Sequence, residues 1–146
     1  MEWHEGEYTL TTDRARVDLG VVHDTLTRSY WATGIPLEVV RRSIEHSLNF
    51  SLLRGAELVG FARVITDYAT FAYVGDVFVL EPHRGRGLSK WMMREIVAHP
   101  ELQGLRRWAL LTRDAHGLYE LAGFTPLAAP ERWMERWTPN VYGAAG

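Results

Sequence analysis

Hydrophobic residues recur along this chain at two spacings, which separate predicted strands from predicted helices. Alternating or continuous apolar runs predict strands at residues 6–13, 50–53, 58–66, 71–80 and 108–112. Shorter runs near the end of the chain predict two closing strands at residues 125–127 and 133–137. The sequence Arg-Gly-Ala-Glu at residues 54–57 separates two of the runs and predicts a hairpin turn.

Four segments carry apolar residues at the spacing of a helix face. Asp18 precedes the first segment as an expected N-cap, and Pro36 begins the second. The third segment spans residues 87–99, and the fourth spans residues 115–122 with Gly123 in the position of a C-terminal cap.

The order of these elements predicts the fold class. Antiparallel strands punctuated by helices are typical of an α/β (α+β) arrangement. We expect a single mixed, mostly antiparallel sheet with flanking helices, formed by one domain over residues 1–146. Gly75 interrupts the strand at residues 71–80 and indicates a β-bulge there.

Composition narrows the class of protein further. The 146 residues are 47% hydrophobic and 23% charged, as in ordinary globular domains, and the absence of cysteine excludes disulfides and thiolate chemistry. A net charge of −2 gives no general attraction to nucleic acid or membrane, and the polar N-terminus is unlike a secretory signal, so we expect a cytoplasmic protein. The six histidines lack metal-ligand spacing, so no metal is expected and we assign them to the surface or loops.

A glycine-rich loop at the centre of the chain is the most informative local pattern. The strand at residues 71–80 leads into Arg84-Gly85-Arg86-Gly87-Leu88-Ser89, where an amphipathic helix begins. The first turn of a helix has unpaired N–H groups and a positive dipole end, so it favours an anion such as pyrophosphate. The glycines let the backbone approach that anion, Ser89 is small, and the arginines add positive charge.

Two well-known phosphate-binding motifs do not fit this loop. Lys90 does not stand in the frame of a P-loop, and it occupies the position of the third glycine in a dinucleotide fingerprint. A different nucleotide-phosphate module is therefore disfavoured. A surface turn that merely contains glycines and arginines is a further alternative, but the preceding strand and the following helix favour a binding loop.

The loop resembles motif A of the Gcn5-related N-acetyltransferase (GNAT) family, Arg/Gln-x-x-Gly-x-Gly/Ala, with Arg84, Gly87 and Ser89 at the defined positions. Ser89 departs from the family pattern by a small increase in volume. Residues 118–124, Leu-Tyr-Glu-Leu-Ala-Gly-Phe, are similar to a second family segment, Leu-Tyr-Glu-Lys-x-Gly-Phe. The strand order agrees as well, so the resemblance covers nearly the whole chain.

The resemblance implies an acetyl-CoA-dependent N-acetyltransferase that acts on a primary amine of a small molecule or peptide, by direct attack in a ternary complex. In the family, backbone groups of the strand before the loop contact the pantetheine arm, and here they would belong to Val77, Phe78 and Val79. The coenzyme-binding loop residues would be Arg84, Gly85, Arg86, Gly87, Leu88 and Ser89. A non-catalytic acyl-CoA sensor is the alternative, although Tyr119 argues against it because a sensor needs no general acid.

Two catalytic groups follow from the same resemblance. Tyr119 matches the tyrosine with which the family commonly protonates the departing thiolate, and Asp76 on the central strand is the candidate base. A structural ion pair is an equally good explanation of Asp76, and Asp67 is its rival as the base. Tyr30 and Trp31, between the first two helices, are expected to bind the acceptor, unless these aromatic residues form core or the surface of a homodimer.

Overall fold

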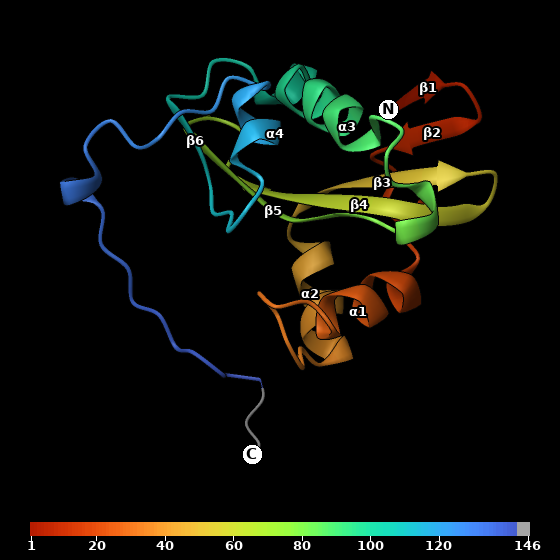
Figure 1. Cartoon of the computed structure of the whole chain (residues 1–146), viewed down its shortest axis with the longest axis horizontal. Coiled ribbons are helices and arrows are strands. Elements are labelled where there is room, and N and C mark those ends of the chain that lie inside the picture. Colours follow the sequence, from red (N-terminus) through yellow and green to blue (C-terminus); the bar gives the residue numbers. More distant parts are fainter. Residues whose placement is uncertain (143–146) are drawn as a thin grey trace.

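The computed structural model describes residues 1–142 and contains a six-stranded sheet whose strands lie in chain order (Figure 1). The strands are β1 (Glu2–Glu5), β2 (Tyr8–Thr11), β3 (Leu48–Arg54), β4 (Glu57–Thr66), β5 (Phe71–Val79) and β6 (Arg107–Leu110). Neighbours are antiparallel except for β5 and β6, which are parallel. The predicted mixed, mostly antiparallel sheet is confirmed.

Helices flank the sheet on both faces (Figure 1). They are α1 (Leu19–Thr27) and α2 (Leu37–Glu45) on one face, and α3 (Leu88–Val97) and α4 (His116–Glu120) on the other. Asp18 is the N-cap of α1 as predicted, because its Oδ1 accepts a hydrogen bond from the Val21 amide at 3.2 Å. No helix within residues 1–142 is long and apolar enough to cross a membrane.

The buried side chains form two clusters, one on each face of the sheet. Phe61 and Phe78 belong to the cluster beneath α1 and α2, whereas Phe50 and Met92 belong to the cluster beneath α3. Because alternate residues of a strand point to opposite faces, β4 and β5 supply apolar side chains to both clusters. These two strands are therefore covered on both faces of the sheet.

The N-terminal hairpin extends further toward the N-terminus than the sequence pattern predicts. A single strand was expected at residues 6–13, but β1 and β2 pair from Glu5↔Tyr8 to Glu2↔Thr11. Within β1 only Trp3 is partly buried, and its ring stacks on that of Phe50 with 6.1 Å between centroids. The other β1 residues are polar and exposed, so no apolar alternation marks this edge strand.

The bulge expected near Gly75 is present in β5. Phe61 of β4 pairs with Phe78, but Arg63, two residues on, pairs with Gly75, so β5 contains one extra residue between these pairs. Asp76 lies in this interval with a φ angle of 53°, in the left-handed region that a non-glycine residue rarely adopts. The bulge bends β5 at the point where it separates from β6.

The two closing strands predicted at residues 125–127 and 133–137 do not form within this chain. After α4 the chain makes a 3₁₀ turn at Pro130–Arg132 and continues as an exposed segment that is assigned to no strand. Figure 1 shows this segment standing away from the sheet. This prediction was wrong, because side chains alternate along the segment but within residues 1–142 no neighbouring strand pairs with it.

Candidate active site

The loop between β5 and α3 places two glycines at the start of the helix. Gly85 and Gly87 have left-handed φ angles of 79° and 75°, and α3 begins at Leu88. No side chain caps this helix, and a Cβ atom placed on either glycine would meet nothing within 4 Å. The backbone of the first turn is therefore open to a ligand, and its amide groups favour an anion.

A pocket of about 420 Å³ lies over this loop. We call it the loop pocket, and it is lined by Val79, His83, Arg84, Gly85, Gly87, Leu88, Ser89, Lys90 and Leu118. Two contacts hold the loop: Arg84 Nε donates to the Val79 carbonyl oxygen at 2.8 Å, and His83 Nδ1 lies 2.9 Å from the Tyr8 hydroxyl oxygen. These contacts fix the loop without any help from a ligand.

Strands β5 and β6 are paired for a short distance and then separate. Their register runs from Phe71↔Arg107 to Val74↔Leu110, whereas β5 continues to Val79. Beyond Val74, the edge of β5 on the β6 side has no strand partner within residues 1–142. Backbone N–H and C=O groups on that edge are therefore available to a ligand that extends from the loop pocket.

A second pocket, of about 790 Å³, lies along the same stretch of β5. We call it the aromatic pocket, since Tyr30, Trp31, Tyr73, Tyr119, Trp137 and Tyr142 all line it. Its charged lining residues are Arg63, Asp76, Arg113, Asp114 and Glu135. Leu118 lines the loop pocket while Tyr119 lines the aromatic pocket, so adjacent residues of α4 connect the two.

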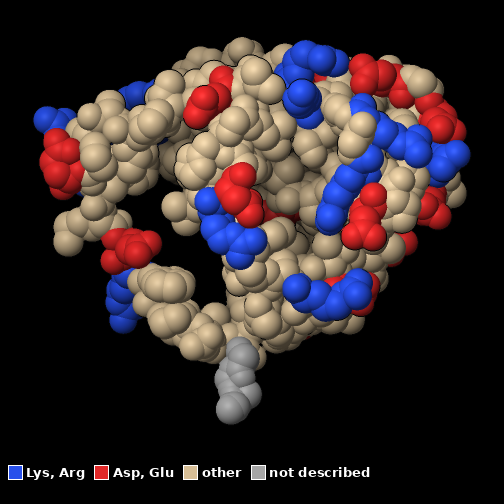
Figure 2. Space-filling model, viewed as in Figure 1, with Lys and Arg blue, Asp and Glu red and all other residues tan. Residues whose placement is uncertain are grey.

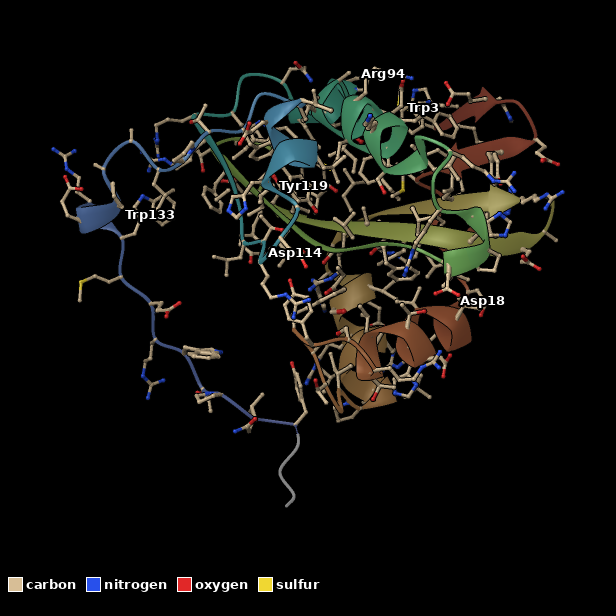
Figure 3. All side chains as sticks on the ribbon, in the orientation of Figure 1. Trp3, Asp18, Arg94, Asp114, Tyr119 and Trp133 are labelled. Carbon is tan, nitrogen blue, oxygen red and sulfur yellow. The ribbon has the colours of Figure 1, made fainter. Side chains whose placement is uncertain are left out.

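Tyr119 is a buried tyrosine at the boundary between the pockets. Its side chain is 9% exposed and lies edge-on to Phe124, with 6.2 Å between ring centroids. Figure 3 shows Tyr119 on α4, with Asp114 in the loop that precedes that helix. Burial, and to a lesser degree Tyr30, raises the pKa of the Tyr119 phenol, so the hydroxyl retains its proton at neutral pH.

Both carboxylate oxygens of Asp76 accept hydrogen bonds from other side chains. Its Oδ2 accepts a hydrogen bond from Arg63 Nε at 2.8 Å, and its Oδ1 accepts one from the Trp31 indole N–H at 3.0 Å. The side chains of Arg63 and Asp76 are only 17% and 11% exposed. Arg63 Nη1 also donates to Ser47 Oγ at 3.0 Å, so the network ties β4 and β5 to the connection between α2 and β3.

Asp67, the other carboxylate considered as a base, has a different environment. Its Oδ1 accepts hydrogen bonds from the backbone amides of Ala69, Thr70 and Phe71, and its Oδ2 accepts one from the Thr70 hydroxyl. These bonds, those of Thr70 first, hold the pKa of the Asp67 carboxyl well below its usual range. Asp67 therefore closes the turn between β4 and β5, and it does not line the aromatic pocket.

The residues expected to bind the acceptor form one wall of the aromatic pocket. Tyr30 and Trp31 lie edge to face, with 5.2 Å between ring centroids, in the connection between α1 and α2. The Arg113 guanidinium lies 3.8 Å from the centre of the Tyr30 ring, which is cation–π geometry. The structure thus brings Tyr30, Trp31, Asp76 and Tyr119 together from three separate segments.

Comparison with known proteins identifies the family to which this arrangement belongs. Residues 13–124 match the model of the acetyltransferase (GNAT) family. The chain belongs to the GNAT family. A relative from Gibberella zeae, named as a candidate acetyltransferase, is 31% identical over 140 residues, covering 80% of this chain and 78% of the relative.

Solved structures agree with this membership. A crystal structure of a candidate GNAT acetyltransferase from Xanthomonas campestris is 52% identical, with a TM-score of 0.92 over 96% of this chain and 99% of the other. An acetyltransferase structure with acetyl-CoA from Clostridium acetobutylicum has a TM-score of 0.64 at 14% identity and covers 88% of this chain and 94% of that one. At that identity the second likeness shows only a common fold.

The residues predicted to bind the coenzyme do not all line the same pocket. Val79, Arg84, Gly85, Gly87, Leu88 and Ser89 line the loop pocket, whereas Val77 lines the aromatic pocket. Phe78 and Arg86 line neither pocket. The Phe78 side chain is 8% exposed and packs against Phe61, so only its backbone is placed to meet a ligand.

Sequence reasoning missed several residues of this GNAT site. His83 was assigned to the surface or a loop, yet it is buried in the loop pocket, and His99 is buried in the core. Arg63, which donates a hydrogen bond to Asp76 in the aromatic pocket, was not singled out. A signal existed for Arg63, because it is a charged residue inside an otherwise apolar strand, where a buried partner is required.

Proposed function

We propose that this GNAT protein transfers the acetyl group of acetyl-CoA to a primary amine of a small molecule or peptide, by direct attack within a ternary complex. The proposal rests on one observation: the loop pocket and the aromatic pocket, which differ in chemistry, lie next to each other along the edge of β5. The loop pocket offers backbone N–H groups suited to an anion, and the aromatic pocket offers rings and carboxylates suited to an amine. Tyr119 lies where they meet. A cytoplasmic location, expected from the polar N-terminus, is part of the same proposal.

The loop pocket fits the phosphate end of the acyl donor. Open space over Gly85 and Gly87 leaves room for a pyrophosphate against the backbone, and Ser89 and Lys90 line the same surface. The unpaired edge of β5 from Gly75 to Val79 leads from this pocket to the aromatic pocket, which matches the need of an extended arm for backbone hydrogen bonds. One of these amides would also polarise the thioester carbonyl, a contribution worth about 3 kcal/mol in comparable sites.

The reaction moves one proton from the amine to the sulfur. The amine nitrogen attacks the thioester carbonyl carbon, a carbon–nitrogen bond forms, and the carbon–sulfur bond breaks. Tyr119 donates its proton to the departing thiolate, and the nitrogen gives its excess proton to Asp76, directly or through water. Burial favours the protonated phenol, so Tyr119 keeps the proton until negative charge develops on the sulfur.

The lining of the aromatic pocket favours an amine with a cationic or apolar body. Arg63 is paired with Asp76 and Arg113 with Asp114, while Glu135 forms no ion pair within residues 1–142. The half-exposed rings of Tyr30 and Trp31 line the same pocket as these carboxylates, and the Arg113 guanidinium lies over one face of Tyr30. A positive or flat apolar group is the ligand chemistry that such a surface attracts.

The proposal is tested by thiol release from acetyl-CoA in the presence of amines. Polyamines, arylalkylamines, aminoglycosides, amino acids and peptides are each assayed, with a matched alcohol in place of the best amine as a control. We expect release with at least one amine class and none with the alcohol. Binding of acetyl-CoA, seen as a rise in melting temperature, without release for any amine would instead support the acyl-CoA sensor. No binding at all would overturn the proposal.

A further inference from the structure

The lining of the aromatic pocket has an enclosed part and an exposed part. The buried lining residues are Ala32, Ile35, Val74 and Tyr119. We call these residues, together with the largely buried Arg63 and Asp76, the floor of the pocket. Tyr30, Arg113 and Asp114 are exposed, and we call them the rim. An acceptor that enters the pocket therefore passes charged groups at the rim and meets mainly apolar and aromatic surface at the floor.

The floor has no charge left for a second positive group of an acceptor. Arg63 and Asp76 neutralise each other, and the indole N–H of Trp31 also donates to Asp76. In the reaction proposed above, Asp76 receives the proton of the reacting amine. The other carboxylates of the described lining, Asp114 and Glu135, are exposed. A second ammonium group would therefore find no enclosed carboxylate with which to pair, and its burial would be costly.

The rim already holds a cation that belongs to the protein. The Arg113 guanidinium lies 3.8 Å from the centre of the Tyr30 ring and 3.3 Å from a carboxylate oxygen of Asp114. The contact with Tyr30 runs from the loop between β6 and α4 to the connection between α1 and α2. An aromatic face and a carboxylate both attract an organic cation. Arg113 therefore occupies the place at the rim where a cationic part of an acceptor would otherwise bind.

We propose that Arg113 determines acceptor specificity: it disfavours amines with a second positive charge, so that the pocket takes amines with one charge and a flat apolar body. This inference depends on the function proposed above, and it chooses between the cationic and apolar acceptor bodies that the lining favours. A second ammonium group would have to displace the guanidinium from Tyr30 and Asp114, or remain beside a like charge. A ring needs no partner charge and gains contact with the aromatic side chains of the pocket.

The surrounding surface adds no field of one sign that would outweigh Arg113. Figure 2 views the molecule from the same side as Figure 3 and shows acidic and basic side chains next to one another over this face. Glu135, which forms no ion pair within residues 1–142, is exposed, so water and salt screen its charge. The contact of Arg113 with Tyr30 is therefore the feature that distinguishes singly from doubly charged amines.

Titration calorimetry with three amines tests this role of Arg113. Butylamine has one charge and no ring, putrescine adds a second charge to the same carbon chain, and phenethylamine adds a ring instead. Each amine is titrated into the full chain with and without coenzyme A, which carries no acetyl group to transfer. We expect the wild-type chain to bind phenethylamine most tightly and to bind putrescine no more tightly than butylamine.

Arg113→Met keeps a long apolar side chain but removes the charge, and it frees the Tyr30 ring and the Asp114 carboxylate together. The affinity for putrescine relative to butylamine should therefore rise by about 10-fold, whereas the preference for phenethylamine over butylamine should persist. Arg41→Met is the matched control, since Arg41 pairs with glutamates of α2 and lines neither pocket, and it should leave both ratios unchanged. The Arg113 and Arg41 side chains are 63% and 46% exposed, so melting curves should show both variants folded.

The titrations can contradict the proposal in several ways. Tighter binding of putrescine than of butylamine by the wild-type chain, or an unchanged ratio in Arg113→Met, would overturn it. Phenylalanine, which adds a carboxylate to phenethylamine, is a further probe: a wild-type preference for phenylalanine that disappears in Arg113→Met would show that Arg113 binds an acidic group instead. Titration requires no acetyl transfer, so binding in the expected order without thiol release would refute only the proposed enzymatic function. Binding of none of these amines would overturn both proposals.

Discussion

The loop pocket and the aromatic pocket lie along the same strand, yet the chain builds them differently. All but one of the residues that line the loop pocket fall between Val79 and Lys90, and its anion-binding groups are backbone amides. The aromatic pocket draws side chains from the α1–α2 connection, α2, β4, β5, the loop before α4, α4 itself and the segment after residue 132. A pocket made of local backbone can be recognised from a short motif, whereas a pocket made of distant side chains depends on the whole fold.

The largest effect is expected where the two pockets meet. Tyr119→Phe keeps the ring and its packing against Phe124 but removes the proton donor, so kcat should fall by about 10²–10⁴-fold. The affinity for acetyl-CoA should change little, because the hydroxyl acts only when the thiolate departs. Steady-state kinetics together with acetyl-CoA titration measure both quantities. An acyl donor with a more acidic thiol should recover part of the rate.

Wild-type turnover in Tyr119→Phe would contradict the assigned role. In that case water protonates the sulfur or product release limits the rate. A melting curve of the variant excludes a trivial explanation, since a lost structural hydrogen bond would cost about 1 kcal/mol. Within residues 1–142, however, the Tyr119 hydroxyl makes no hydrogen bond to another protein group.

The second-largest effect concerns Asp76, whose contribution to stability can be measured separately from its contribution to catalysis. Asp76→Asn leaves the Arg63 guanidinium buried without its partner charge, so the free energy of unfolding should fall by about 3 kcal/mol. Urea unfolding measures this loss. The double variant Arg63→Met/Asp76→Asn removes both charges and should recover most of the stability, because breaking a buried pair costs more than replacing it.

The double variant also decides the role of Asp76 in the reaction. A stable but inactive double variant supports Asp76 as the base, because the scaffold has then been restored without the carboxylate. Recovery of turnover along with stability would show that Asp76 only positions Trp31 and Arg63. The comparison needs both variants, since Asp76→Asn alone loses activity for either reason.

A smaller effect, on the affinity for acetyl-CoA, tests whether the backbone amides of the loop pocket bind phosphate. Ser89→Glu places a carboxylate in the first turn of α3, where it suits the helix dipole but repels a bound phosphate. We expect the Kd for acetyl-CoA to rise by about 30-fold, equivalent to roughly 2 kcal/mol, with an unchanged or higher melting temperature. Ser89→Ala is the control and should bind normally.

Substitution of Gly87 would be a less clean test of the same pocket. Its φ angle of 75° is one that a branched residue adopts only with strain, so Gly87→Val would disturb the loop as well as fill it. If Ser89→Glu binds acetyl-CoA as well as wild type does, the phosphate site lies elsewhere and the contrast between the two pockets fails.

Much of the fold was predictable because its signals are local. The Asp18 cap of α1, the hairpin at residues 54–57 and the amphipathic face of α3 each depend on neighbours in sequence, and each is present in the structure. Gly123 was expected to cap the helix at residues 115–122, but α4 ends at Glu120 and its C-cap is Leu121. The N-terminal strand β1 was missed because three of its four residues are polar and exposed. The segment at residues 133–137 was misassigned because alternation indicates a tendency to pair but does not supply a partner strand.

The site was predictable to a different extent in each pocket. Motif A located most of the loop pocket, but no local pattern could show that Arg63 lies within hydrogen-bond distance of Asp76. That contact depends on the pairing of β4 with β5 and on the bulge between them. Sequence alone therefore left Asp76 and Asp67 as rival bases, although their surroundings in the structure differ completely.

The smallest effect concerns Asp67, and it tests whether the roles of Asp67 and Asp76 differ. Because its hydrogen bonds lower the pKa of the carboxyl in the folded state, the charged form stabilises the fold at any pH above the unfolded pKa of about 4. That stabilisation is lost as the pH falls from there through the folded pKa. Asp67→Asn should therefore lower the melting temperature slightly at pH 7, and the difference from wild type should shrink at acidic pH. Turnover per folded molecule should equal that of wild type, because the side chain is committed to the turn at residues 67–71. A loss of kcat without a pH-dependent change in melting temperature would instead make Asp67 the base, and the aromatic pocket would then not contain the group that deprotonates the amine.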